Sequence, residues 1–553
     1  MRDERRRARS DIATVLLHWT MVVAVTISLI SGFPIADDAG VTEWTRLFSA
    51  IFLHGDVFQI HLWSSVVVTV VSFAYAAYLF FAKLVGRIVL DKVRLTALAS
   101  SDRTARWGAI NVAIYWLAFG MLALMAATGL MLYDGTAIVS HETLAMLHRG
   151  GAWAFLAYAA LHAVAQLFSG GIRQLLKILS PRLAYGSAAA IAVGVGGAAA
   201  AATVYAVDAL TARSLTVARI GSADAPRLDG RDDEGIWQRT MPVTLQTTRG
   251  SNFPGGEVPV TIRAAHDGQF AYFMFTWPDS TRSQKHLPIV KTADGWRVLE
   301  KNYSRQDEDD YYEDKFGVML AKSGQVSGGS THLGRQPIAG APGSPNERGL
   351  HYTTDGSMVD VWHWKSVRTG GMGMIDDNYF GAPIPPTEEQ LAGKKRYTGG
   401  YTQDPHTKGG FIQNWKKLEG GLVQPLHLPA HKDTLKRMEP IKLDPTASDE
   451  GTWWLPLAET QPYTPEADAT LPVGTVLPSA VIDAPFEGDR GDVLAVGYWQ
   501  DGEWRLEVRR KLITNSKFDQ PIATGTYLWV AAFDHSQTRH TRHLRPLRLE
   551  LEQ

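Results

Sequence analysis

Five long apolar stretches near the start of the chain constrain its fold more than any other feature. A helix needs about 20 consecutive apolar residues to cross the hydrocarbon core of a bilayer. Since no water is available there, each stretch must satisfy its own backbone hydrogen bonds, which predicts helices. The stretches are Ala13–Ile35, Phe58–Ala82, Ala109–Tyr133, Thr143–Phe168 and Leu183–Val207. The first part of the chain is therefore predicted to be an all-α transmembrane bundle.

The two parts of the chain differ in charge, although the whole chain is nearly neutral. The 553 residues include 55 Lys and Arg and 56 Asp and Glu, of which residues 1–207 hold 16 and 11, a net charge of +5. The remainder therefore holds 39 and 45, a net charge of −6. The net charge of −1 thus averages a membrane part with a polar, water-soluble part, and it indicates no nucleic-acid partner.

Basic residues predict the orientation of the helices, because they accumulate in cytoplasmic loops. They cluster before the first stretch, between the second and third, and between the fourth and fifth, whereas the other loops hold almost none apart from Arg46. The clustered residues are Arg2, Arg5, Arg6, Arg7, Arg9, Lys83, Arg87, Lys92, Arg94, Arg103, Arg106, Arg173, Lys177 and Arg182. We therefore expect a multi-pass protein of a bacterial inner membrane, with a cytoplasmic N-terminus and a periplasmic chain from residue 208. The first stretch is too long for a cleavable signal peptide.

Histidines are nearly the only ionisable residues inside the predicted helices, and such residues usually serve a function. His18 and His162 each lie about six residues from the cytoplasmic end of their stretch, whereas His61 and His148 lie near the outer end. His148 and His162 are 14 residues apart, which is about 21 Å of helix and about 40° from a whole number of turns. These depths predict an inner pair, His18 with His162, and an outer pair, His61 with His148.

Two bis-histidine haems of type b across a helical bundle require such an arrangement. The alternative is that the four histidines only tolerate the interfacial region and bind nothing. His54 and His141 are expected in interfacial loops, and His54 is a rival to His61. The absence of cysteine excludes covalent c-type haem, iron–sulfur clusters, thiol catalysis and disulfides.

Several phrases of the first part resemble the bacterial cytochrome b561 family, which groups with the cytochrome b subunits of nickel–iron hydrogenases and formate dehydrogenases. They are LLHW around His18, the histidine opening the second stretch, ATGLMLYDG, and the two-histidine stretch. The resemblance implies four haem-binding helices, two haems b, membrane electron transfer and exchange with quinone. It departs at Ser65, where the family often has glycine. Arg149 either pairs with a haem propionate or is ordinary basic decoration of an interface.

The remainder of the chain changes to alternating polar and apolar residues, which is typical of strands. VPVTIRAAHDGQFAYFMFTW predicts a strand, a turn at Asp-Gly and a second strand. WRLEVRRKLI, TYLWVAAFD and LRPLRLELEQ are further predicted strands. We expect an all-β sandwich with long loops and little helix. The expected domains are a cytochrome b561-like membrane domain over 1–182, a fifth helix with small residues and a linker over 183–213, and the sandwich over 214–553.

Phrases in this second part resemble the haem-binding domain related to the gamma subunit of ethylbenzene dehydrogenase. They are LDGRDDEGIW, FTWPDSTRS, YYEDKFGVML, VDVWHWKS, IDDNYF and WRLEVRRKL followed by GTYLWVAAFD. The resemblance implies a sandwich that holds a b-type haem through a methionine and a lysine near the last strands. No lysine stands at that place here, where His540 or His543 could replace it. The methionine candidates are Met358 and Met319, of which Met319 is more typical of core packing.

Other features of the second part leave alternatives open. Relatives can carry a CxxCH motif where this chain reads VSGGSTHLG, so His332 either ligates a non-covalent haem or marks a vestigial site. The acidic run QDEDDYYED lacks the regular ligand spacing of a calcium-binding loop, which favours a solvated loop. Trp362 and Trp364 point the same way on one strand, toward either a ring ligand or the core. No nucleotide-binding or hydrolase motif is present.

Together these features predict a membrane-bound b-type cytochrome that carries electrons between the quinone pool and a periplasmic redox protein or molybdoenzyme. Two haems would lie in the bundle, surrounded by membrane lipid, with a third in the sandwich. One alternative is a periplasmic reductase acting on a small substrate. Another is a haem-free ligand-binding sandwich anchored by a cytochrome b.

Overall fold

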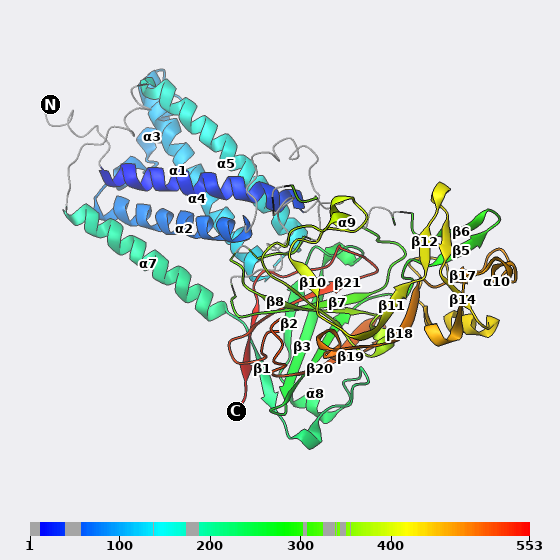
Figure 1. The fold of residues 1–553 in the computed structure, drawn as a ribbon. Helices are drawn as coiled ribbons and strands as arrows, with labels where there is room; N and C mark the ends of the chain where they lie inside the picture. The colour runs from blue at the N-terminus through cyan, green and yellow to red at the C-terminus, as the bar shows by residue number, and fades with distance from the viewer. Residues whose placement is uncertain are drawn as a thin grey trace. The chain divides into compact units, whose positions relative to one another are not determined.

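The computed structural model of the protein describes residues 12–38, 57–135, 138–172, 187–301, 303, 307–324, 338, 340–342, 350–353 and 355–553. These residues form two compact units, the first ending at Ala212 and the second beginning at Arg213. The first unit is helical and the second is built mainly of strands (Figure 1). The predicted combination of a helical membrane part with a β domain is therefore confirmed.

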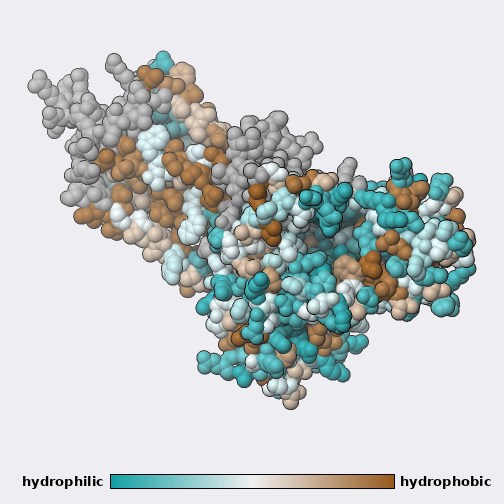
Figure 2. Space-filling view, in the orientation of Figure 1, coloured by the Kyte–Doolittle hydropathy of each residue, from teal (hydrophilic) through white to brown (hydrophobic). Residues whose placement is uncertain are grey.

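Five helices in the first unit are long and apolar enough to cross a membrane. They coincide with the five predicted stretches, and each extends a few residues beyond its prediction or is shifted by a few residues. The helices are α1 Ile12–Asp38, α2 Val57–Phe81, α4 Arg103–Asp134, α5 His141–Gly170 and α7 Ser187–Thr211. On the face shown in Figure 2, apolar residues cover much of this unit, as expected for side chains that meet lipid rather than water.

Small residues allow the helices to approach one another closely. Helix α2 packs against α1 and α7, while α4 packs against α5. The hydroxyl groups of Ser28 and Ser64 form a hydrogen bond of 2.7 Å between α1 and α2. A side-chain carbon added to Gly196 of α7 would lie 2.7 Å from the Cβ of Ala77 on α2. The small residues of the fifth helix thus serve the close packing that the sequence predicts.

The connection from α2 to α4 is a structured basic segment. It contains the short helices η3 Val85–Arg87 and α3 Lys92–Ala97. The Arg94 guanidinium donates hydrogen bonds of 2.7 Å to the carbonyl oxygen of Gly86 and 2.6 Å to that of Val89. These hydrogen bonds fix the conformation of the segment, which carries several of the basic residues from which the orientation is predicted.

The second unit is organised around a sheet of 12 strands. Eleven strands follow the order β10-β9-β8-β7-β21-β22-β1-β3-β4-β20-β19, and β2 pairs with β3. The strands are β1 Ser214–Arg219, β2 Val243–Thr247, β3 Val258–His266, β4 Phe270–Pro278, β7 Lys315–Ala321, β8 Val359–Lys365, β9 Asp376–Phe380, β10 Tyr401–Gln403, β19 Leu494–Gln500, β20 Glu503–Lys511, β21 Tyr527–Phe533 and β22 Leu547–Leu551. The predicted hairpin at Asp267–Gly268 joins β3 to β4, and the three further predicted strands correspond to β20, β21 and β22.

Smaller sheets and three short helices complete the second unit. One sheet contains β11 Lys408–Gln413, β15 Trp454–Pro456 and β18 Ala480–Glu487; another contains β5 Ile289–Thr292, β6 Gly295–Val298, β12 Trp415–Lys417, β13 Val423–Pro425 and β17 Val476–Leu477; the last pairs β14 His427–Pro429 with β16 Thr460–Pro462. The α-helices are α8 Gly235–Arg239, α9 Glu388–Leu391 and α10 Pro465–Ala469. The expected low helix content of this part is confirmed.

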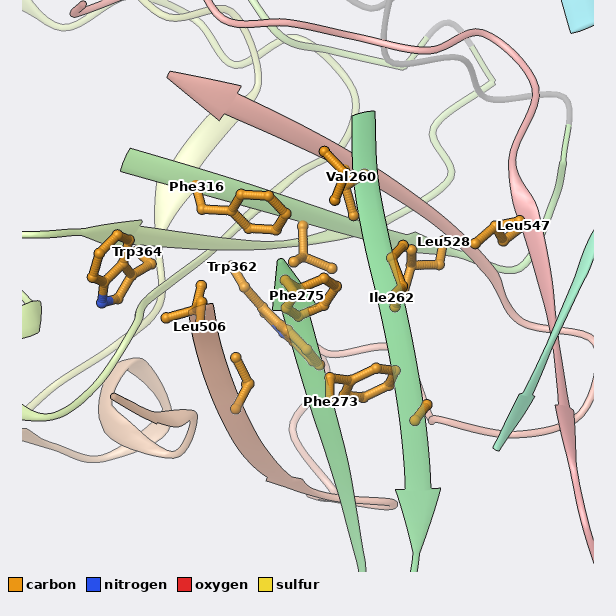
Figure 3. Packing of buried hydrophobic residues seen from close by; sticks show 14 of the residues in the cluster. Val260, Ile262, Phe273, Phe275, Phe316, Trp362, Trp364, Leu506, Leu528 and Leu547 are labelled. Carbon is orange, nitrogen blue, oxygen red and sulfur yellow. The ribbon is translucent and has the colours of Figure 1, made fainter. Parts of the chain in front are cut away.

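The large sheet folds over on itself, so that its two halves form two layers with the core between them. Phe273 and Phe275 of β4 contact rings on β8 and β7, with ring centres 5.9 Å apart for Phe273 and Trp362 and 5.0 Å for Phe275 and Phe316. Four strands separate β4 from β7 in the hydrogen-bonded order, so these contacts join opposite layers rather than neighbouring strands (Figure 3). This is the packing of a sandwich.

Strand β8 shows how the alternation of the sequence becomes two chemically different faces. Trp362 and Trp364 are 0% and 1% exposed and both lie in the core between the layers. Both tryptophans therefore pack in the core, which corrects the expectation that one of them could stack on a ligand. His363, Lys365 and Val361 point to the other face of the sheet, because successive residues of a strand alternate.

Replacing Trp362 with alanine should destabilise the second unit strongly. Removing a fully buried aromatic side chain costs about 3–5 kcal/mol, which lowers Tm by about 10 °C for a domain of this size. Thermal unfolding of the full-length protein in detergent, followed by near-UV circular dichroism, measures the change. Leu418→Ala is the control, since Leu418 is 48% exposed; equal Tm shifts for the two variants would contradict the core assignment.

Candidate functional site

The rings of His61 and His148 lie opposite each other inside the helical unit. His61 is on the first turns of α2 and His148 is on the third turn of α5. Their ring centres are 6.2 Å apart and their planes are 77° apart. The structure thus brings together the pair that the depths in the sequence predict to be the outer one.

Hydrogen bonds fix both of these rings through Nδ1. His61 Nδ1 lies 2.9 Å from the carbonyl oxygen of Ser28 and 3.1 Å from Ser31 Oγ. His148 Nδ1 lies 2.9 Å from Thr128 Oγ1, which itself donates a bond of 2.7 Å to the carbonyl oxygen of Leu124. Both Nδ1 atoms are therefore the protonated ones, and Nε2 is the nitrogen suited to a metal.

A glycine on a neighbouring helix lies against each ring of this pair. A Cβ atom at Gly32 of α1 would stand 3.3 Å from His61 Cε1, and one at Gly129 of α4 would stand 3.2 Å from His148 Cε1. Such distances are tighter than ordinary packing, so a side chain at either position would press on the imidazole. Gly129 belongs to the ATGLMLYDG phrase. Gly32 provides close approach to His61 from α1, so Ser65 on α2 need not provide it.

His18 of α1 and His162 of α5 form a second pair, as the sequence depths predict. Their ring centres are 6.5 Å apart and their planes are 41° apart. The rings of Tyr115 and Tyr158 each lie 5.7 Å from the His162 ring. Among the described residues, His162 Nδ1 is buried without a hydrogen-bond partner. This pair therefore differs from the first, whose Nδ1 atoms are all hydrogen-bonded.

Polar side chains gather beside His162 in an otherwise apolar bundle. Gln166 Nε2 lies 3.3 Å from Asn111 Oδ1 and 3.4 Å from the Tyr115 hydroxyl. Gln166 is one turn beyond His162 on α5, so these groups lie at the same end of the unit. The sequence analysis missed this cluster, although a glutamine and an asparagine within predicted transmembrane helices are a usable signal.

The donor set and the spacing of both pairs fit haem b. An iron bound by two imidazole nitrogens at about 2 Å, each nitrogen about 1 Å from its ring centre, places the two centres about 6 Å apart. The observed 6.2 Å and 6.5 Å agree with this value. Neutral imidazoles are competent axial ligands, and the chain has no cysteine to attach the porphyrin. Ligation by these four residues stays a prediction.

Three other residues of the membrane part were singled out from the sequence. Arg149 follows His148 on α5 and is half-buried, so its pairing with a propionate stays a prediction. His141 is the first residue of α5 rather than a loop residue. His54 lies outside the described residues.

In the second unit, His543 uses both ring nitrogens within the fold. Nε2 accepts a hydrogen bond of 2.9 Å from the Val530 amide, and Nδ1 lies 2.8 Å from the carbonyl oxygen of Arg545. Burial lowers the pKa of His543 to about 4, so the ring is neutral. An iron at Nε2 would break the bond to β21. These two bonds argue against His543 as an axial ligand, and its ligation of a haem stays a prediction.

The remaining candidates of the second unit are not all close to one another. Met358 lies at the beginning of β8, where its carbonyl oxygen accepts a hydrogen bond from Gln520. His540 lies near the other end of β8. Its ring centre is 4.9 Å from that of Phe533 on β21. Phe533 pairs with Lys315 of β7, which in turn pairs with Lys365 at the end of β8. Seven residues of strand span about 20 Å, so Met358 and His540 are too far apart to share one iron. His332 lies outside the described residues.

His363, within the DVWHWK phrase, is a histidine that the sequence analysis overlooked. Its Nε2 is buried and has no hydrogen-bond partner among the described residues. Its ring stacks on Phe533 at 5.3 Å, and Phe533 also contacts His540. Met319 lies on the same face of β7, opposite Val361. The alternation on β8 is the signal that could have found His363, since it must face away from Trp362 and Trp364.

Buried cations surround this face. Lys365 pairs with Asp376, and Arg368 pairs with Glu313. Lys315 Nζ donates a bond of 2.7 Å to the carbonyl oxygen of Gln537 and lies 4.0 Å from the centre of the Phe533 ring. Burial, followed by these neighbouring positive charges, lowers the pKa of His363 well below its usual value. The neutral imidazole is the form that binds metals.

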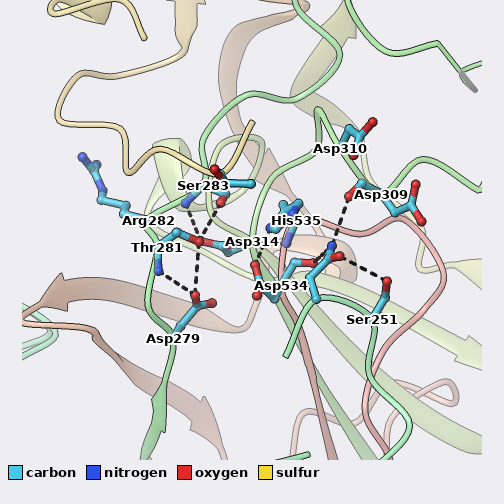
Figure 4. A network of polar contacts seen from close by, with 12 residues as sticks. Ser251, Asp279, Thr281, Arg282, Ser283, Asp309, Asp310, Asp314, Asp534 and His535 are labelled. Carbon is cyan, nitrogen blue, oxygen red and sulfur yellow. Dashed lines mark hydrogen bonds and ion pairs between the residues drawn. The ribbon is translucent and has the colours of Figure 1, made fainter. Parts of the chain in front are cut away.

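Four of the family-like phrases, FTWPDSTRS, YYEDKFGVML, WRLEVRRKL and GTYLWVAAFD, contribute to one buried polar network, part of which Figure 4 shows. Asp314, from YYEDKF, accepts hydrogen bonds from the backbone amides of Ser283 and His535 and from the indole of Trp504. His535 pairs with Asp534, from AAFD. Burial alone would lower the pKa of His535, but the bond to Asp534 and the nearby carboxylates outweigh it and raise the pKa. The phrases therefore meet in one hydrogen-bonded network of the fold.

Glu507 joins WRLEVRRKL to one further phrase. From β20, its carboxylate accepts bonds from the amides of Asp229 and Gly230, at 3.0 and 3.1 Å, and from the indole of Trp237 at 3.1 Å. LDGRDDEGIW and WRLEVRRKL thus meet at one side chain. Burial outweighs these bonds and raises the pKa of Glu507 to about 7.

The acidic run QDEDDYYED is not the solvated loop that its spacing favours, since Glu308, Glu313 and Asp314 are buried. Side chains of the protein pair with part of it. Arg539 pairs with Asp307 at 2.6 Å and with Asp309 at 3.1 Å, and Arg368 pairs with Glu313.

Comparisons with known proteins identify both parts of the chain. The model of the family described as Ethylbenzene dehydrogenase matches residues 234–545, more than half of the 553 residues. The chain belongs to the ethylbenzene dehydrogenase family. Its first part matches the family described as Prokaryotic cytochrome b561 over residues 9–181. Both predicted resemblances are confirmed, and the protein is a multi-pass membrane cytochrome that binds haem b and takes part in electron transfer.

Two further comparisons add no assignment. No curated protein matches this member of the ethylbenzene dehydrogenase family. A family 9 carbohydrate-binding module from Caldicellulosiruptor kristjanssonii aligns with 62% of this chain in two solved structures. The glucose complex is covered to 97%, with 9% identity and a TM-score of 0.23, and the cellotriose complex to 95%, with 10% identity and a TM-score of 0.22.

Replacing Glu507 with glutamine should flatten the pH dependence of stability. A carboxyl group whose pKa is raised by folding keeps its proton in the folded state while the unfolded chain has lost it, so stability falls as pH rises from about 4.5 to about 7. The variant lacks this contribution, and its Tm should fall less than that of the natural protein between pH 5 and pH 8. Glu503→Gln on the same strand is the control; parallel Tm profiles for the natural protein and Glu507→Gln would contradict the assignment.

Proposed function

We propose that this protein carries electrons across a bacterial inner membrane, between the quinone pool and a periplasmic redox partner. The proposal depends on the two histidine pairs, whose ring centres lie 6.5 and 6.2 Å apart between helices of an apolar bundle. His18 with His162 and His61 with His148 would each hold one haem b. When bound, haem b supplies one-electron chemistry at its iron.

The surrounding residues would orient these ligands and keep the site apolar. Ser28 and Ser31 hold Nδ1 of His61, and Thr128 holds Nδ1 of His148, which directs both Nε2 atoms between the rings. Gly32 and Gly129 leave the space in which those rings stand. A low-dielectric bundle and fixed hydrogen bonds are the means by which a protein sets the potential of such a centre.

Quinone would exchange electrons and protons near His162. Asn111, Tyr115 and Gln166 supply hydrogen-bonding groups there, within segments that otherwise face lipid. Such groups can orient a quinone carbonyl and hold a proton beside it. They lie at the end of α5 where the sequence predicts the cytoplasmic side.

The orientation we propose places the second unit in the periplasm. Lys83, Arg87, Lys92 and Arg94 lie on the connection from α2 to α4, and basic connections stay in the cytoplasm. Five crossings then bring Arg213 to the opposite side. The net charge of −6 in this part suits a basic periplasmic partner, either a small redox protein or a molybdoenzyme.

We propose that the second unit holds a third haem on the outer face of β7, β8 and β21. Met319, His363 and His540 are the candidate ligands on that face. The Nε2 atom of His363 supports this choice, because it is buried and has no hydrogen-bond partner among the described residues. Met358 and His332, predicted from the sequence, are the alternatives. Electrons would then pass from the two haems of the bundle to the third haem and on to the partner.

Counting haem tests the proposal. The pyridine haemochrome assay on the purified full-length protein should give three haems per chain. His18→Ala and His61→Ala should each remove one haem, since each loses a ligand of a different pair, and the double variant should retain one. His141→Ala is the matched control and should retain all three.

Three results would contradict parts of this proposal. Two haems in the natural protein, with none left in the double variant, would remove the haem from the sandwich and favour a haem-free binding domain. Unchanged haem content and spectra in both single variants would remove the bundle assignment. Loss of haem in His141→Ala alone would move the ligand to that position.

Thr128→Val should shift the potential of one haem only. The variant keeps the size of the side chain but removes the hydrogen-bond acceptor of His148 Nδ1, which makes the imidazole less basic and stabilises the reduced iron. The midpoint potential should rise by up to about 60 mV, which is a tenfold change for one electron. Spectroelectrochemical titration measures it.

Thr26→Val is the control for this variant, because the partner of the Thr26 hydroxyl within the described part of the chain is the Val22 carbonyl oxygen of its own helix. Equal midpoint potentials in the natural protein and in Thr128→Val would show that the hydroxyl group does not tune a haem ligand.

A further inference from the structure

A second group of carboxylates in the β unit contains none of the residues proposed above as haem ligands. One carboxylate oxygen each of Asp377, Asp404 and Asp519 lies within 4.8 Å of the other two. Asp377 belongs to β9, Asp404 follows β10, and Asp519 lies on the loop from β20 to β21. Two nearby segments and a third more than 100 residues further along the chain therefore bring their acidic side chains to one point.

These carboxylates are removed from solvent. Asp377 is 0% exposed and Asp404 is 2% exposed, and the side chain of Asp519 is 2% exposed. Asp360 of β8 and Asp492, which follows the short helix η10 Asp489–Gly491, adjoin the group electrostatically. Five carboxylates thus share one buried region, which is unfavourable unless their charges are compensated.

The protein supplies only part of that compensation. Arg510 of β20 pairs with Asp360 at 3.2 Å and with Asp519 at 2.8 Å. Within the described residues, Asp377, Asp404 and Asp492 form no ion pair with a lysine or arginine. One guanidinium facing five carboxylates leaves an excess of up to four negative charges.

The side chain of Asp404 provides an independent indication that a ligand binds at this group of carboxylates. Both of its carboxylate oxygens are buried and have no hydrogen-bond partner among the described residues. Its backbone is fixed, since its amide donates a bond of 3.1 Å to the carbonyl oxygen of Asp377. The side chain is therefore held with two free acceptors directed at its acidic neighbours. Burial, followed by repulsion from Asp519 and Asp360, raises the pKa of Asp404 to about 8.

The other buried carboxylate group shows the contrast. Around Asp314, the carboxylates receive hydrogen bonds from the amides of Ser283 and His535 and from the indole of Trp504, and His535 pairs with Asp534. Asp314 and Asp534 thus each receive hydrogen bonds from the protein, although Oδ2 of the neighbouring Asp279 is buried without a partner among the described residues. Asp404 differs because neither of its carboxylate oxygens has a partner among those residues.

We propose that Asp377, Asp404 and Asp519 bind a divalent cation of the calcium type, with Asp360 and Asp492 completing the acidic surroundings. Oxygen ligands without histidine or cysteine favour a hard cation over zinc. Calcium accepts six to eight oxygens in flexible geometry, which suits carboxylates from separate loops plus water. The cation would tie β9 and the end of β10 to the loop before β21.

Calcium binding and thermal unfolding of the full-length protein in detergent test this proposal. After treatment with EGTA and dialysis, adding CaCl₂ should raise Tm by about 5 °C when calcium is well above its dissociation constant, and elemental analysis should find one calcium per chain. MgCl₂ should have a smaller effect. Terbium, a calcium substitute, should show luminescence sensitised by Tyr379, which neighbours Asp404.

Asp404→Asn should abolish the calcium-dependent rise in Tm and the terbium luminescence while leaving the haem spectrum unchanged. Asp314→Asn, in the other buried carboxylate group, is the matched control and should keep both signals. If Asp404→Asn does not fold, calcium stoichiometry and terbium luminescence of the natural protein still decide. No bound calcium in the natural protein, or loss of binding in Asp314→Asn but not in Asp404→Asn, would overturn the proposal.

Discussion

The membrane unit depends on placing polar imidazole rings between helices that otherwise offer only apolar surface. A buried ring nitrogen without a partner is costly in hydrocarbon. For His61 and His148 the partners are a backbone carbonyl and hydroxyl groups of neighbouring helices. Gly32 and Gly129 then determine how closely α1 and α4 approach those rings. The same few residues therefore set both the packing of the helices and the orientation of the imidazole rings.

The β unit depends on a different use of buried polarity. Asp314 and Glu507 each collect donors from segments far apart in the chain. A buried carboxylate that accepts three hydrogen bonds fixes the segments that donate them, since removing one donor leaves an uncompensated group. The sequence phrases that resemble the family contain, in large part, the residues of these hydrogen-bonded networks. The outer face of β8, with His363 and the buried cations near it, is where we propose a third haem.

The sequence predicts much of this arrangement and fails at identifiable points. The five helices and the hairpin at Asp267–Gly268 follow from local periodicity, which the backbone must obey. The pairing of His18 with His162 follows from depth, because a bilayer orders helices along one axis. The two hydrogen bonds that argue against His543 could not be predicted from sequence, since they come from Val530 and Arg545 in the folded strands. His363 was predictable from alternation but was hidden by the two tryptophans beside it.

The sequence by itself determined the number of membrane helices, the histidines within them, the strand-rich second part and the absence of thiol ligands. These properties depend on composition and on periods of two or 3.6 residues, which are local. Only the tertiary structure decided which polar groups meet: Thr128 with His148, Glu507 with Gly230, and Asp404 with Asp377 and Asp519. Such meetings join residues tens or hundreds of positions apart, and no local pattern encodes them, because they depend on how sheets and helices close over a shared core.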